Sequence, residues 1–135
     1  MKRILAIMLA CAAGVHAETK IWLGGDGDFA TPELWSGSGV PKAGDEVVIS
    51  NGAVTVSSAD TSFTGLVSIA LGTGGTIVCS TNETQASMTF SSGSTLRVSA
   101  GELAIHGFAS GTGFTKEGAG NVRFTGRNSS LTAMV

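Results

Sequence analysis

The stretch Met88–Gly107, MTFSSGSTLRVSAGELAIHG, decides the fold of this chain of 135 residues. It contains three pairs of apolar residues, and a single residue separates the members of each pair. The pairs are Met88 with Phe90, Leu96 with Val98, and Leu103 with Ile105. Alternation with a period of two predicts short β-strands that bury one face. A turn containing glycine follows each pair, and successive pairs start seven or eight residues apart, which indicates one repeated unit.

The chain before this stretch shows the same alternation less regularly. Apolar and small polar residues alternate in the runs Val47–Ser50, Ala53–Ser57, Leu66–Leu71 and Thr76–Ser80. Asn51-Gly52 joins the first two runs and predicts a tight, hairpin-like turn. No segment after Ile49 places apolar residues at helical spacing over three turns. We therefore expect an all-β chain that forms a parallel β-solenoid (β-helix), with an antiparallel β-sandwich as the alternative.

The segment Ile21–Ile49, IWLGGDGDFATPELWSGSGVPKAGDEVVI, precedes the first regular strand and contains both tryptophans and both prolines. We interpret residues 18–45 as an N-terminal cap segment in which a substantially buried Trp35 and a partly buried Trp22 shield the first coil. Residues 46–135 are then the solenoid coils, and the last coil is expected to be incomplete at the C-terminus.

The first seventeen residues have the layout of a secretory signal peptide. Lys2 and Arg3 precede an apolar run, and small residues occupy the −3 and −1 positions before a cleavage site after Ala17. The run is shorter than the about 20 apolar residues that span a bilayer. We expect export to the cell surface or the extracellular space, with no transmembrane segment in the mature chain. Lipidation at Cys11 is the alternative.

The composition of the mature chain limits the classes of partner that it can bind and the bonds that can stabilise it. Loss of Lys2 and Arg3 changes the formal net charge from −2 to −4, and no basic patch remains, which disfavours nucleic acid and anionic membranes as partners, so we expect no nucleic acid. Cys79 is the only cysteine after residue 17, so stability must come from packing and not from an internal disulfide.

The segment Phe114–Gly126, FTKEGAGNVRFTG, resembles the autotransporter-associated β-strand repeat of secreted bacterial proteins. The matching positions are Thr115, Lys116, Gly118, Gly120, Val122, Phe124 and Gly126, and Asn128 continues the pattern. The opening segment with Trp22 and Trp35 is similar to segments that often precede such repeats. The resemblance implies a parallel β-helix passenger at the cell surface or released outside, and it does not imply one activity.

Two groups of residues are candidates for binding. Trp22 and Trp35 offer flat apolar faces on which sugar rings stack, and their alternative role is to close the open end of the stack. Asp26, Asp28 and Asp45 are candidate oxygen ligands for Ca²⁺. Their alternative role is an acidic turn whose side chains accept hydrogen bonds from the backbone.

The sequence contains no motif typical of a catalytic site or a zinc site. His106 is the only histidine after residue 17, and it follows an alternating strand, so we expect it to point away from the core at a solvated corner. A triad of His106 with Ser110 and Glu102 is formally possible, but no nucleophile-elbow motif accompanies it. One histidine and one cysteine exclude an ordinary zinc site, and we expect no cofactor.

The sequence therefore predicts a structural or adhesin-like β-solenoid scaffold that is not an enzyme. Its expected partners are extracellular glycans or envelope components. The segment Leu131–Val135 is apolar and uncharged, so end-to-end self-association is also expected. The alternatives are a carbohydrate-binding module that uses Trp22 and Trp35, or the leading segment of a larger exported enzyme.

Overall fold

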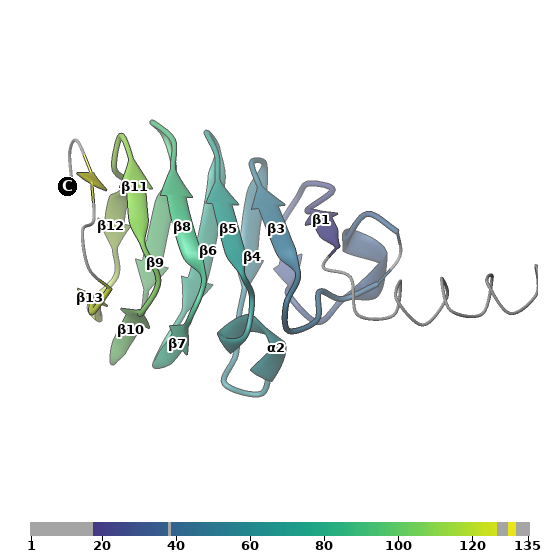
Figure 1. Ribbon diagram of the computed structural model, residues 1–135, viewed down its shortest axis with the longest axis horizontal. Helices are drawn as coiled ribbons and strands as arrows, with labels where there is room; N and C mark the ends of the chain where they lie inside the picture. The colour runs from purple at the N-terminus through teal and green to yellow at the C-terminus, as the bar shows by residue number, and fades with distance from the viewer. Residues whose placement is uncertain (1–17, 38, 127–129, 132–135) are drawn as a thin grey trace, which may run out of the picture.

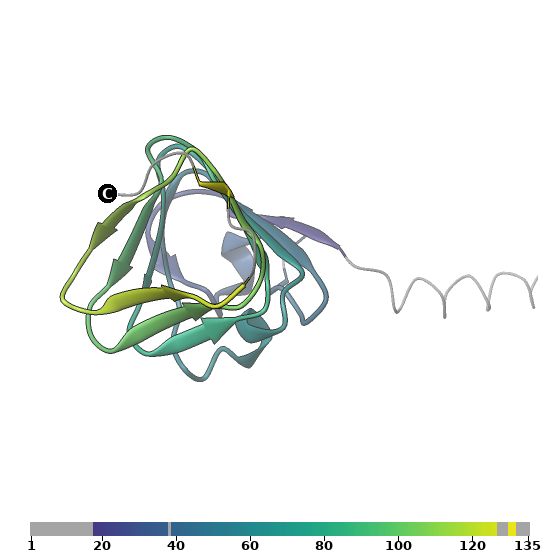
Figure 2. The same ribbon diagram turned by 60° about the vertical axis from the view of Figure 1, so that its left-hand side comes forward.

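The chain winds into a parallel β-solenoid of about four turns, in which 45% of the residues are strand and 6% are helix (Figure 1). The computed structural model describes residues 18–37, 39–126 and 130–131. The signal peptide predicted for residues 1–17 therefore lies outside the described residues. Seen nearly along the stack, the coils superimpose in a three-sided outline (Figure 2).

Three parallel sheets form the sides of the solenoid. Sheet one consists of β1 (Thr19–Ile21), β3 (Glu46–Ile49), β5 (Ser68–Leu71), β8 (Ser87–Phe90), β11 (Ala109–Gly111) and β14 (Ser130–Leu131). Sheet two consists of β2 (Gly27–Asp28), β4 (Gly52–Thr55), β6 (Gly75–Cys79), β9 (Thr95–Val98) and β12 (Thr115–Glu117). Sheet three consists of β7 (Asn82–Thr84), β10 (Glu102–Ile105) and β13 (Asn121–Phe124).

The parallel solenoid predicted from the alternating runs is confirmed, and the antiparallel sandwich is wrong. Every strand pairing within the three sheets of the described chain is parallel. An isolated antiparallel bridge joins Trp22 and Trp35, outside the named strands. Within the described residues, the 3₁₀ helix η1 (Pro32–Leu34) and the α-helix α2 (Thr61–Thr64) are each a single short turn.

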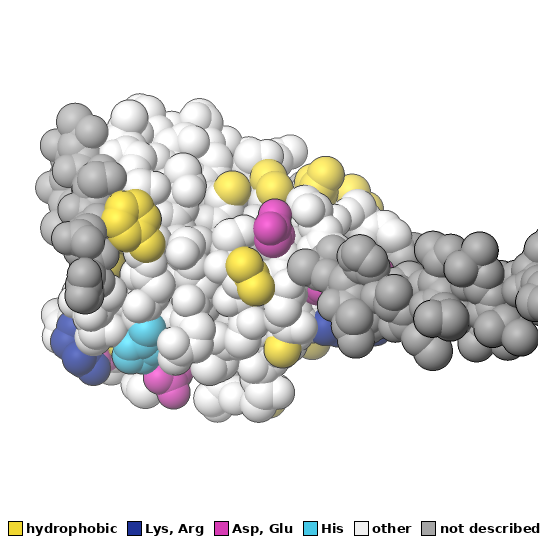
Figure 3. Space-filling view, in the orientation of Figure 1, with side chains coloured by type: hydrophobic (Ala, Val, Ile, Leu, Met, Phe, Trp, Pro, Cys, Tyr) yellow, Lys and Arg dark blue, Asp and Glu magenta, His cyan; other side chains and the backbone are white. Residues whose placement is uncertain are grey.

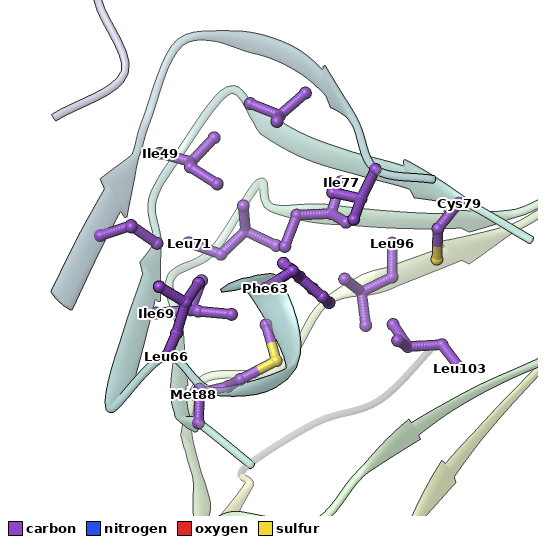
Figure 4. Packing of buried hydrophobic residues seen from close by; sticks show 14 of the residues in the cluster. Ile49, Phe63, Leu66, Ile69, Leu71, Ile77, Cys79, Met88, Leu96 and Leu103 are labelled. Carbon is purple, nitrogen blue, oxygen red and sulfur yellow. The ribbon is translucent and has the colours of Figure 1, made fainter. Parts of the chain in front are cut away.

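Inward-facing residues stack in columns from coil to coil. In sheet one, Val47 pairs with Ile69, which pairs with Met88, so each side chain lies about 4.8 Å from its equivalent in the next coil. In sheet two, Ile77 pairs with Leu96. All of these side chains are at most 1% exposed. Figure 4 shows Ile69, Met88, Ile77 and Leu96 converging with the side chains of neighbouring strands on one continuous core, to which Val47 also belongs.

The three apolar pairs of the deciding stretch are buried as predicted, but they do not lie on one face. Met88 and Phe90 belong to β8 in sheet one, Leu96 and Val98 to β9 in sheet two, and Leu103 and Ile105 to β10 in sheet three. The seven- or eight-residue spacing is therefore the length of one side of a coil. The repeated unit is the whole three-sided coil.

The Asn51-Gly52 turn is present, but it is a corner and not a hairpin. It joins β3 in sheet one to β4 in sheet two, and these strands do not pair. Gly52 has a φ of +97°, and a Cβ at this position would lie 2.0 Å from the carbonyl oxygen of Gly25. Glycine is required here because successive corners touch backbone to backbone.

The predicted cap segment, residues 18–45, is itself part of the stack. Its strand β1 pairs with β3, and its strand β2 pairs with β4. It is therefore a first coil with two short strands. The helix α2 takes the place of a sheet-three strand in the next coil, because Thr64 O and Phe63 O accept hydrogen bonds from the backbone nitrogen of Gln85 and the hydroxyl of Thr84.

Candidate functional site

Both tryptophans lie inside the molecule. Trp35 is fully buried and Trp22 is 3% exposed, and their rings pack edge to face with centroids 4.9 Å apart. The indole nitrogen of Trp35 donates to Phe29 O (2.8 Å), and that of Trp22 donates to Gly25 O (2.9 Å). The predicted burial of Trp35 is confirmed, and Trp22 is more deeply buried than predicted. This arrangement supports the cap and offers a sugar no exposed tryptophan ring.

The three candidate calcium ligands do not form a cluster. Asp26 accepts a hydrogen bond from Ala53 N (3.0 Å), and Asp28 lies on β2. Asp45 is 5% exposed and accepts hydrogen bonds from the backbone nitrogens of Glu18 (3.0 Å) and Lys42 (2.8 Å). No group of three or more His, Cys, Asp or Glu side chains converges for a metal ion within the described part of the chain. Asp26 and Asp45 instead hold the backbone in place.

A charged and polar surface covers the outer side of sheet three. Leu103 and Ile105 of β10 point into the core, so Glu102, Ala104 and His106 alternate on the other face, where Ala104 itself is only 6% exposed. Figure 3 shows acidic, basic and histidine side chains meeting at one edge of the molecule, over the ends of β7, β10 and β13. We call this surface the sheet-three face.

Two sets of contacts cross the sheet-three face. The guanidinium Nε of Arg123 on β13 contacts Glu102 Oε1 on β10 at 2.8 Å. His106 contacts Glu83 Oε1 through Nε2 (2.9 Å) and the hydroxyl of Thr125 through Nδ1 (2.5 Å). The second set links β7, β10 and β13, so it connects three successive coils. His106 faces away from the core as predicted, but its ring is held on both sides and is not simply solvated.

The partners of His106 differ from the residues that the sequence suggested. Glu83 and Thr125 are 23 and 19 residues away from it, which is one coil in each direction. Ser110 and Glu102 are not its partners. Sheet-one partners such as Ile69 and Met88 are also 19 residues apart. A step of 19 residues from His106 reaches Thr125, whereas Glu83 is in register with Ala104 and meets His106 diagonally, so a step of one coil length finds only the first contact.

A pocket of about 390 Å³ lies beside these contacts. It is lined by Ser58, Thr64, Thr81, Asn82, Glu83, Glu102 and Ala104. One rim comes from the segment around α2, and the other comes from β7 and β10. Asn82 ties the two rims together, because its side-chain amide donates to Ser57 O (3.1 Å).

In Glu83, His106 and Thr125, an imidazole lies between a carboxylate and a hydroxyl. The same arrangement of groups activates a hydroxyl nucleophile in many hydrolases. In this chain neither His106 nor Thr125 lines the pocket, so a ligand held there contacts the carboxylate end of the series and not the hydroxyl. The geometry therefore suits recognition of a ligand better than covalent catalysis.

Cys79 is a buried thiol with no role on this surface. It lies at the end of β6, is 3% exposed, and pairs in register with Val98. Burial raises its pKa to about 11, because the low-dielectric core disfavours the thiolate. At neutral pH the thiol is therefore protonated and unreactive.

Comparison of the chain with protein-family models, curated proteins and solved structures gives no match. Among the described residues, no helix has both the length and the apolar character needed to cross a membrane.

Proposed function

We propose that this chain is an exported β-solenoid at the cell surface or in the extracellular space, where it serves as a structural or adhesin-like scaffold without catalytic activity. The observation that carries the proposal is the stacking of inward columns from coil to coil, which gives the described chain one continuous core and extended outer faces. Such stacks present binding surfaces along their length while contacts between neighbouring coils supply the stability.

The glycines of the segment that resembles autotransporter-associated repeats support this proposal. A Cβ at Gly118 would lie 2.2 Å from Val98 O, and one at Gly126 would lie 2.1 Å from Gly107 O. In both cases a corner of one coil rests on the backbone of the preceding coil. The glycine spacing of the segment is therefore the spacing that close stacking of coils requires.

Fractionation of producing cells tests the proposal. We expect the protein in the medium or on the outer surface, with Glu18 as the first residue by N-terminal sequencing, because Ala17 occupies the −1 position of the cleavage site. Accumulation of the uncleaved chain in the cytosol would contradict export. A start at Cys11 with an attached lipid would replace a released protein with an anchored one.

Catalysis is tested separately. Purified protein incubated with chromogenic esters and glycosides is expected to release no more product than buffer. Any turnover that disappears in the His106→Asn variant would contradict the non-enzymatic role, since this variant removes the imidazole between Glu83 and Thr125.

A further inference from the structure

We propose that the pocket between α2 and the strands β7 and β10 binds a neutral, polyhydroxylated ligand, as presented by a segment of an extracellular polysaccharide. This goes beyond the scaffold role. The chemistry of the ligand rests on the lining of the pocket, and its extracellular source rests on the export proposed above. It also differs from a sugar platform at Trp22 and Trp35, whose rings are buried.

The lining offers both donors and acceptors. The hydroxyls of Ser58, Thr64 and Thr81 line the pocket and make no hydrogen bond to another group in the part of the chain that the structure describes, so they are available to a ligand. A hydroxyl both donates and accepts, whereas a carboxylate only accepts. A ligand that satisfies both kinds of group must carry donors and acceptors close together, which is the property of adjacent sugar hydroxyls.

The two carboxylates are held in place for such a ligand. Arg123 contacts Oε1 of Glu102, and His106 contacts Oε1 of Glu83, so in each carboxylate Oε2 has no partner among the described residues. Glu102 and Glu83 are 38% and 57% exposed, so solvent and ligands reach them. Fixing these side chains before binding lowers the entropy lost when a ligand is bound.

The same contacts make a free cation a poorer occupant. Arg123 already compensates the charge of Glu102, and the imidazole of His106 occupies one oxygen of Glu83. The described residues provide no group of three side chains that could hold a metal ion. A neutral ligand needs no further positive charge and gains from every hydrogen bond that the pocket offers.

Ala104 leaves room for the ligand. It lies in register between Glu83 on β7 and Arg123 on β13, so a small side chain separates two long ones. The resulting pocket of about 390 Å³ is at the lower end of the usual range for small-molecule sites, about 300–1,000 Å³. A larger residue at position 104 would occupy this space without changing any charge.

Affinity electrophoresis in native gels tests the proposal with four soluble neutral polysaccharides, namely β-glucan, xylan, galactomannan and dextran. We expect at least one of them to retard the protein. Ala104→Phe should weaken the apparent affinity about tenfold or more, a loss of about 1.4 kcal/mol. Ala70→Phe is the matched control, because Ala70 also points outward from the middle of a strand, β5 in sheet one. It should leave the retardation unchanged.

A second pair of variants keeps the test decisive if Ala104→Phe does not fold, which its melting temperature would show. Glu102→Gln should weaken retardation about fivefold, because a charge-assisted hydrogen bond is lost. Its control is Glu117→Gln, since Glu117 makes an equivalent ion pair with Arg97 on sheet two (2.9 Å).

Three outcomes would overturn the proposal. The first is no retardation by any of the four polysaccharides. The second is equal weakening in the pocket variants and their controls. The third is calorimetric binding of calcium chloride or spermidine that is lost in Glu102→Gln, without polysaccharide binding, which would assign the pocket to a cation.

Discussion

The two ends of the described stack are finished in different ways. At the N-terminal end, the rings of Trp22, Phe29 and Trp35 pack edge to face, and all three are at most 3% exposed. At the other end, Val122 and Phe124 on β13 occupy the columns of Leu103 and Ile105 but are only half-buried. The same inward position is thus fully buried in a middle coil and half-buried in the last sheet-three strand. A coil completes its burial only when a neighbour covers it.

Lysines occupy inward columns at both ends of the stack. Lys20 pairs in register with Val47, and Lys116 pairs with Leu96. Lys20 is 9% exposed, and its ammonium lies 3.3 Å from Glu18. The ammonium of Lys116 donates to Gly118 O. In each lysine a long alkyl stem covers the apolar residue next to it in the column. Lys116 is partly exposed, whereas Lys20 is buried beside Glu18. Aromatic rings also meet at the C-terminal end, where Phe114 packs on Phe124 with ring centroids 5.9 Å apart. The difference between the ends is therefore burial, because the rings of the N-terminal cluster are at most 3% exposed whereas Phe124 is half-buried.

The largest loss of stability is expected from a substitution at the N-terminal end, where the aromatic rings are buried. Trp35→Ala removes a fully buried ring, its contact with Phe29 (centroids 5.5 Å apart) and a buried hydrogen bond. We expect a loss of about 3–5 kcal/mol in the free energy of unfolding, a large share of the stability of a small domain. Chemical denaturation followed by circular dichroism measures it. Unchanged stability would show that the cluster is not part of the cooperative core.

The burial of the middle coils is tested by the pH dependence of stability that Cys79 causes. Its pKa is about 11 in the folded chain, against 9.0 for a thiol in water. The folded state therefore holds the proton more tightly, and the thiol contributes stability that is full below pH 9 and is lost as the pH rises to 11. The full loss is about 3 kcal/mol, since the pKa differs by about two units and one unit corresponds to about 1.4 kcal/mol.

The control is Cys79→Val, which keeps a small apolar side chain in the core but has no ionisable group. The difference in stability between the two proteins should change between pH 9 and pH 11 and stay constant below pH 9. A constant difference over the whole range would show that the thiol is not buried as the structure describes.

The buried positions could be predicted from the sequence because alternation is a local property. Whether a residue such as Leu96 faces inward depends on its immediate neighbours along the strand. The number of sides in a coil could not be predicted in the same way. A spacing of seven or eight residues fits one strand per repeat as well as three, and only the pairing of residues about twenty positions apart distinguishes them.

The candidate site depends on the same long-range register. Glu83, His106 and Thr125 come together only when three coils are aligned, and no local pattern marks them. The helix α2 was also missed, because a single turn has no periodicity to detect. Its Phe63 is 1% exposed and packs edge to face on Phe29, with centroids 5.9 Å apart. The sequence suggested candidate calcium ligands among the acidic residues near Trp22, whereas the pocket lies between α2 and the strands β7 and β10.

A smaller loss of stability is expected from a substitution of Phe124 on β13, at the C-terminal end of the described stack. Phe124 packs on Phe114, with ring centroids 5.9 Å apart, but remains half-buried. Phe124→Ala should cost roughly 1–2 kcal/mol, because less apolar surface returns to water than for a fully buried ring. Phe90→Ala is the matched control in a middle coil and should cost about 3–5 kcal/mol. Equal costs in denaturation experiments would mean that something covers Phe124 as fully as Phe90.

The smallest effect on stability, under about 1 kcal/mol, is expected for Lys116→Leu, because Lys116 is only partly buried and its hydrogen bond is exposed.

The effect of Lys116→Leu on association should be larger. Lys116 places a charge at the end of the column that contains Leu96, and charges at an open edge oppose pairing with another chain. Light scattering on residues 18–135 should show concentration-dependent end-to-end association that increases in Lys116→Leu. Lys42→Leu, a change of the same kind in the exposed loop before β3, should have no such effect. A monodisperse monomer for both variants at high concentration would mean that the end of the stack is closed without Lys116, and that the self-association expected from the apolar segment Leu131–Val135 does not occur.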